Sequence, residues 1–261
     1  MAGEFAGKVV VVTGGSRGIG RGIAVGFAGE GAQTVIASSS ADNLAAAGKV
    51  IAQVGPEPLA VAGDLRKLAD CERLFAIVKE RFGRCDILVN NAGRTRAGNF
   101  LELPDEAFFD GFALKYHAAM RLTRLFWPML KEAQGHVVNI VGGAARSPEP
   151  EFTIGSSVNA ALANASKGLS KLGMRDGINV NVIHPGNTRT ERSEELLAQR
   201  AQAAGKSIEE MRKAALARSG IRRIGEVEDI AALALFLCSE KARHIQGTAI
   251  AVDGGATVGY Y

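Results

Sequence analysis

Short runs of β-branched and other apolar residues alternate along the chain with longer stretches whose apolar residues recur at helical spacing. The first run, residues 9–12, is apolar at every position, which is typical of a strand buried on both faces of a parallel sheet. Predicted strands lie at about 9–12, 34–37, 59–61, 86–89, 136–141, 178–183 and 249–252. Predicted helices lie at about 18–29, 41–54, 68–82, 106–131, 156–174, 190–218 and 227–239. This alternation predicts a doubly wound α/β fold with about seven parallel strands and helices on both faces.

The domain organisation follows from length and pattern. A chain of 261 residues suits one such domain, and no repeat, low-complexity tract or linker interrupts it. We therefore expect residues 1–261 to form a single domain. Residues 191–220 differ in composition, being rich in charged residues, Gln and Ala and poor in bulky apolar ones. We expect residues 188–220 to form a flap that covers the substrate.

Composition and charge narrow the classes of partner. The 31 basic and 27 acidic residues are mixed along the chain, which argues against a nucleic-acid partner. The three cysteines, Cys71, Cys85 and Cys238, lack the spacing of metal ligands, so we expect no metal site. No apolar stretch reaches the ~18 residues of a membrane span, and the first eight residues are too short and polar for a signal peptide. We expect a cytoplasmic protein that does not contact a membrane.

A glycine-rich turn follows the first predicted strand. Gly14, Gly18 and Gly20 stand between that strand and the next predicted helix. Glycine permits positive φ and lets backbone amides approach a pyrophosphate, and the helix N-terminus adds partial positive charge. The alternative is a tight turn without a ligand. The position directly after the first strand favours a dinucleotide site.

The spacing Thr-Gly-x-x-x-Gly-x-Gly at residues 13–20 resembles the fingerprint of the short-chain dehydrogenase/reductase family. Other segments resemble that family's motifs, namely Asp64-Leu65, Asn90-Asn91-Ala92-Gly93, Pro185-Gly186 with Thr188 and Thr190, and the closing segment 245–255. The resemblance spans about residues 5–255. It implies a Rossmann domain that binds NAD(P), acts on a small-molecule carbonyl or alcohol, and forms a homodimer or homotetramer.

The resemblance also assigns the positions that contact the cofactor. They are Gly14, Ser16, Arg17, Gly18, Ile19, Gly20, Ser38, Ser39, Ser40, Asp64, Leu65, Asn91, Ala92, Gly93, Pro185, Gly186, Thr188 and Thr190. Residues 38–40 follow the second strand, where an acid would favour NAD(H), and they offer three hydroxyls and no carboxylate. With Arg17 they favour NADP(H) over NAD(H). The alternative for Arg17 is a solvated loop residue.

The resemblance implies a catalytic Ser, Tyr, Lys and Asn, but the matching positions carry other residues. Counting back from the Pro185 motif places the Lys position at Asn159, the Tyr position at Gly155 and the Ser position at Gly142. Counting back from Pro128 places the Asn position at Lys115.

A second register, with Lys167 as the catalytic lysine, puts Ala163 at the Tyr position and shortens the path to Pro185 by two helical turns. Neither register contains the tyrosine.

Lys115 and Asn159 therefore exchange an amine and an amide between the family's Asn and Lys positions. We hypothesise that both are catalytic, with Lys115 acting as an acid or electrostatic stabiliser through a depressed pKa. The alternative is a decayed site with ordinary polar replacements.

Three alternative functions agree with these observations. The first is an NADP(H)-dependent oxidoreductase with a non-standard active site. The others are a non-redox isomerase, dehydratase or lyase, and a catalytically silent partner protein that binds the cofactor.

Overall fold

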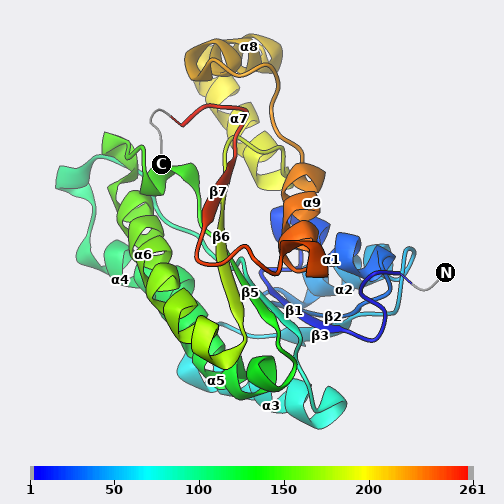
Figure 1. The fold of residues 1–261 in the computed structure, drawn as a ribbon. Coiled ribbons are helices and arrows are strands. Elements are labelled where there is room, and N and C mark those ends of the chain that lie inside the picture. Colours follow the sequence, from blue (N-terminus) through cyan, green and yellow to red (C-terminus); the bar gives the residue numbers. More distant parts are fainter. Residues whose placement is uncertain (1–2, 258–261) are drawn as a thin grey trace.

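A computed structural model describes residues 3–257, which form a parallel sheet of seven strands (Figure 1). The strands are β1 (Val9–Thr13), β2 (Gln33–Ser38), β3 (Leu59–Ala62), β4 (Ile87–Asn90), β5 (His136–Ile140), β6 (Asn179–Pro185) and β7 (Ala249–Val252). Their order is β3-β2-β1-β4-β5-β6-β7, so the strand order reverses between β1 and β4. Ligands of open α/β sheets bind outside the carboxyl ends of the strands at this switch point.

Helices cover both faces of the sheet, as predicted (Figure 1). One face packs against α1 (Gly18–Gly29), α2 (Ala41–Ile51) and α9 (Val227–Leu237). The other packs against α3 (Leu68–Phe82), α5 (Ala118–Glu132) and α6 (Thr153–Asp176). The predicted fold class is therefore confirmed.

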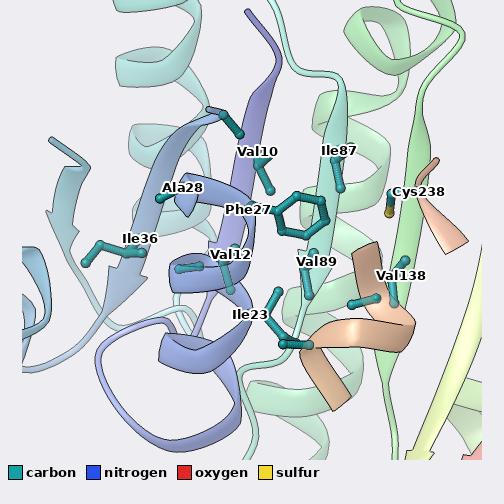
Figure 2. Close-up of a cluster of buried hydrophobic side chains, with 14 of the residues drawn as sticks. Val10, Val12, Ile23, Phe27, Ala28, Ile36, Ile87, Val89, Val138 and Cys238 are labelled. Atoms are coloured by element: carbon teal, nitrogen blue, oxygen red, sulfur yellow. The ribbon is translucent and has the colours of Figure 1, made fainter. Parts of the chain in front are cut away.

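The core explains why the first strand is apolar throughout. Val10 and Val12 pack with Ile23 and Phe27 of α1, as Figure 2 shows, while Val11 faces the opposite cluster. Each of these five side chains is fully buried. Truncating a buried phenylalanine such as Phe27 to alanine costs about 3–5 kcal/mol in such a core.

The helix predicted at 106–131 is present without a break, but it is not α-helical throughout. The structure has α4 (Asp105–Gly111), a π-helical segment (Phe112–His117) and then α5. The apolar spacing does not reveal the extra residue of a π turn, which changes the direction of the side chains within it. The segment carries Lys115, and such bulges are frequent at functional sites.

The polar insert predicted at about 190–218 consists of two helices, α7 (Glu191–Ala204) and α8 (Ile208–Ser219). Gly205 ends α7 with a left-handed φ of 62°. Ser207 begins α8 by accepting a hydrogen bond from the Glu210 amide, in a capping box.

Candidate active site

The glycine-rich turn brings the end of β1 against the start of α1. Gly14 and Gly18 adopt positive φ values of 65° and 53°. A Cβ on Gly20 would lie 2.3 Å from the Gly14 carbonyl oxygen and 2.4 Å from Nδ2 of Asn91. The close approach therefore requires glycine at position 20.

The turn after β4 is fixed to the glycine-rich turn. Thr13 Oγ1 accepts hydrogen bonds from the amides of Asn91 and Ala92, both at 3.0 Å. The Asn91 amide group donates to the carbonyls of Thr13 (3.0 Å) and Gly14 (3.3 Å). These four bonds bring Asn91 and Ala92 to the switch point beside Gly14.

The N-terminus of α1 already holds an anionic group. Glu191, the first residue of α7, accepts a hydrogen bond from the Gly18 amide at 3.0 Å and also pairs with Arg21. Amides of a first helical turn lack intrahelical acceptors, and the helix dipole favours negative charge there. The sequence analysis missed Glu191. Its carboxylate shows that this turn can bind an anion, as a dinucleotide diphosphate requires.

The residues assigned to the adenosine end follow β2 and β3. Ser40 caps α2 by accepting the Asn43 amide, and Ser39 and Arg17 are exposed. Asp64 is paired with Arg66, which holds the pKa of Asp64 below its ordinary value.

Three other positions with assigned cofactor contacts have less exposed side chains. Leu65 is buried in the core, so only its backbone faces this edge. Ser16 is also buried, and Ile19 is partly buried against the core beneath α1.

The segment after β6 lies beside the same turn. A Cβ on Gly18 would lie 3.2 Å from Cγ2 of Thr190, which caps α7. A Cβ on Gly186 would lie 2.5 Å from Cβ of Asp253, so this backbone is tightly packed after Pro185. The hydroxyl of Thr188 donates to the Gly186 carbonyl at 3.2 Å.

Lys115 extends between the β4 and β5 turns. A Cβ on Gly93 would lie 2.9 Å from Cδ of Lys115, and the ammonium donates a hydrogen bond to the Val141 carbonyl. Burial lowers the pKa of Lys115 to about 8. A lysine with this pKa carries an exchangeable proton near neutral pH.

Asn159 and His184 meet the same β5 turn. A Cβ on Gly142 would lie 2.9 Å from Nδ2 of Asn159, which is 5% exposed. Nδ1 of His184 lies 2.8 Å from the Gly142 carbonyl oxygen. Residues 141 and 142 thus lie against three polar groups from three different elements: the amine of Lys115, the amide of Asn159 and the imidazole of His184.

A phenylalanine ring fills the space beside Gly155. A Cβ at that position would lie 2.1 Å from two ring carbons of Phe152. The Lys167 ammonium donates to the Gly247 carbonyl at 2.9 Å, whereas the Lys115 ammonium donates to the Val141 carbonyl. Neither Gly155 nor Lys167 therefore places a polar side chain beside Lys115.

Two kinds of feature are absent from residues 3–257. No cluster of His, Cys, Asp or Glu side chains in this range has the arrangement of a metal site. No helix in it is long and apolar enough to cross a membrane.

The protein is similar to known oxidoreductases along its whole length. Residues 14–257 match the family model described as enoyl-(acyl carrier protein) reductase. L-Fucose dehydrogenase of Bos taurus is 34% identical, with 100% of this chain and 93% of that protein covered.

Solved structures agree with the sequence comparison. L-Sorbose reductase of Gluconobacter frateurii, in complex with NADPH and L-sorbose, superposes with a TM-score of 0.95 at 32% identity and full coverage of both chains. A 7α-hydroxysteroid dehydrogenase in complex with NADH superposes with a TM-score of 0.86 at 29% identity, covering 97% of this chain and 95% of that one. The chain belongs to the short-chain dehydrogenase/reductase family.

Proposed function

We propose that this protein is an NADP(H)-dependent oxidoreductase that interconverts a carbonyl and an alcohol, with Lys115 as the proton donor. The observation that carries the proposal is the Lys115 ammonium, held at the β5 turn with its pKa lowered to about 8. A general acid works best when its pKa lies near the operating pH. Solved relatives complexed with NADPH and with NADH make a nicotinamide the expected cofactor.

The family's usual catalytic positions would correspond here to Gly142, Gly155, Asn159 and Lys115. In this register Gly155 and Gly142 offer no side-chain hydroxyl to a substrate oxygen. An ammonium has three N–H donors. Lys115 gives one to the Val141 carbonyl, which leaves two for a substrate oxygen. Asn159, beside Gly142, would hold that oxygen in place through its amide group.

The cofactor would lie along the edge from Ser38 to Thr190. Amides at the start of α1 would bind its diphosphate, at the place where Glu191 now binds the Gly18 amide. Arg17 and the hydroxyls of residues 38–40 would bind a 2′-phosphate, since these three residues carry no carboxylate that would repel it. A reduced nicotinamide would supply the hydride, and Lys115 would supply the proton that completes the alcohol.

Residues 188–220 would form the flap over the substrate. Their two helices join the sheet through Thr190 and Glu191, which contact the glycine-rich turn. Cofactor that displaces Glu191 from the Gly18 amide would change the position of α7.

The protein would form a homodimer or homotetramer through α5 and α6. Met120, Trp127, Leu169 and Leu172 line an apolar hollow of about 500 Å³ on these two helices. A second copy of this chain would cover it, and Leu172→Glu should then shift the mass measured by light scattering toward the monomer.

The decisive experiment compares Lys115→Met with the wild type in carbonyl reduction, using NADPH and a panel of ketoses and other small ketones. We expect kcat to fall about 100-fold or more, because general acids contribute 10²–10⁴-fold, while the Kd for NADPH stays unchanged. Lys167→Met is the matched control and should keep full activity.

Equal turnover in the Lys115→Met variant would remove Lys115 from the mechanism. NADPH binding without reduction of any carbonyl would favour a non-redox enzyme or a silent partner protein. Absence of binding to both NADPH and NADH would overturn the proposal.

A further inference from the structure

Three solvent-accessible arginines come from three segments that meet at the glycine-rich turn. Arg17 lies in that turn, Arg94 follows the turn after β4, and Arg192 lies in the first turn of α7. Because all three side chains are exposed, a ligand in the open edge of the sheet can reach them.

Close contacts join the three segments. A Cβ on Gly14 would lie 3.1 Å from Cα of Ala92, so the turn after β4 lies against the glycine-rich turn. A Cβ on Gly18 would lie 3.2 Å from Cγ2 of Thr190, and the Gly18 amide donates to the Glu191 carboxylate at 3.0 Å. Each of the three arginines is therefore within two residues of a contact that joins its segment to its neighbour.

The three guanidinium groups are close enough to repel one another. Partial burial lowers the pKa of Arg192, and the charges of Arg94 and Arg17 lower it further, whereas the charge of Glu195 raises it. Among residues 3–257, no carboxylate forms a hydrogen bond or an ion pair with any of the three guanidinium groups.

Neighbouring arginines at the same edge do have carboxylate partners. Arg21 pairs with Glu191, and Nε of Arg189 lies 3.6 Å from a carboxylate oxygen of Glu226. Like charges that gather without a counter-ion repel one another, and a bound anion removes that repulsion. The three clustered arginines therefore indicate an anionic ligand that lies against the glycine-rich turn and the start of α7.

On the basis of the function proposed above, we propose that Arg94 and Arg192 bind the diphosphate of the cofactor. Guanidinium groups bind phosphate oxygens through paired N–H donors. Phosphate at the Gly18 amide takes the place of the Glu191 carboxylate, and the same negative charge attracts the next residue, Arg192. Residues 188–220 thus hold the cofactor as well as covering the substrate, while Arg17 serves the 2′-phosphate.

Calorimetric titration of the full-length protein with NADPH and with NADH tests this assignment. Both nucleotides carry the diphosphate, whereas only NADPH carries the 2′-phosphate. Arg192→Gln and Arg94→Gln should therefore each weaken the binding of both nucleotides about tenfold, the loss of one charge-assisted contact.

Two matched controls remove the same charge from the same segments. They are Arg200→Gln in α7 and Arg96→Gln after β4, and both side chains are exposed. Each control should bind both nucleotides like the wild type. The melting temperature of each variant checks folding.

Unchanged affinity for both nucleotides in the Arg192→Gln and Arg94→Gln variants would overturn the assignment and leave the proposed function intact. A loss confined to NADPH would also overturn it, because these arginines would then bind the 2′-phosphate. Equal losses in the matched controls would overturn it by showing an effect of net charge alone. A wild-type protein that binds neither nucleotide would overturn the proposed function and this assignment together.

Discussion

Two parts of the carboxyl edge of the sheet are built from different groups. At β1 and β4 two side chains bind the backbone of the two turns to each other: Thr13 Oγ1 accepts two amides, and Asn91 donates to two carbonyls. At β5 and β6 three side chains, Lys115, Asn159 and His184, converge on residues 141–142. The contacts at β1 and β4 fix the backbone of the two turns, whereas an amine, an amide and an imidazole surround the turn after β5.

The two parts differ in how freely their residues can change. The proposed nucleotide edge depends on close backbone approach, so its glycines have little freedom to change. The proposed catalytic edge depends on which side chains meet at one turn, and side chains can change while the backbone around them stays in place. The predictions below test this division of roles.

The largest effect on cofactor binding is expected from Gly20→Ala at the proposed nucleotide edge. The new Cβ would lie 2.3 Å from the Gly14 carbonyl oxygen, and overpacking of this kind costs about 1–3 kcal/mol. We expect NADPH affinity, measured by calorimetry, to fall about 100-fold.

Gly29→Ala in the same helix is the matched control, since no atom lies within 4 Å of its new Cβ. Its NADPH affinity should equal that of the wild type. Full affinity in the Gly20→Ala variant would show that the nucleotide edge tolerates change.

The pH dependence of turnover probes the catalytic edge. Burial lowers the pKa of Lys115 to about 8, so the protonated amine that reduction needs is lost as pH rises through 8. We expect kcat for carbonyl reduction to fall about tenfold per pH unit above that value. Alcohol oxidation needs the neutral amine and should rise up to the same pH.

Lys115→Met should abolish both pH dependences. If this variant kept the wild-type dependence of kcat on pH, another group would be the one that titrates, and Lys115 would take no part in the proton transfer.

Arg17→Gln tests whether the proposed nucleotide edge distinguishes NADPH from NADH. Loss of one charge-assisted contact to a 2′-phosphate should weaken NADPH binding about tenfold and leave NADH binding unchanged. The ratio of the two calorimetric Kd values reports the effect, and NADH is the internal control. An equal loss for both cofactors would mean that Arg17 supports the turn rather than the phosphate.

Asp86→Asn, at the opposite edge of the sheet, should have the smallest effect on the sites. Burial alone would raise the pKa of Asp86, but hydrogen bonds from Arg84 and the Val9 amide hold it below its ordinary value. A carboxyl with a depressed pKa stabilises the fold above about pH 4, and this contribution is lost as pH falls through the folded-state pKa.

The Asp86→Asn variant should therefore be about 1–3 kcal/mol less stable in urea unfolding at pH 7. The difference from the wild type should shrink toward pH 2, and NADPH affinity should stay the same. A loss of NADPH affinity at unchanged stability would contradict a purely structural role.

The sequence alone predicted the parallel sheet, its two covered faces and the glycine-rich turn after β1. Apolar runs such as residues 9–12 mark buried parallel strands, and Gly14, Gly18 and Gly20 mark the turn, because these features depend on local periodicity and on φ. Counting from the motifs also singles out Lys115 and Asn159 as candidate residues, but it does not predict which groups they contact.

Only the tertiary structure decided which side chains meet. Glu191 reaches the Gly18 amide across 173 positions of sequence, and His184 reaches Gly142 across 42. The π-helical turn that carries Lys115 leaves no mark in the apolar spacing, and the Phe152 ring beside Gly155 follows from packing. Long-range contacts depend on how crossovers bring distant strand ends to one edge, and the burial that lowers the Lys115 pKa exists only once that edge is assembled.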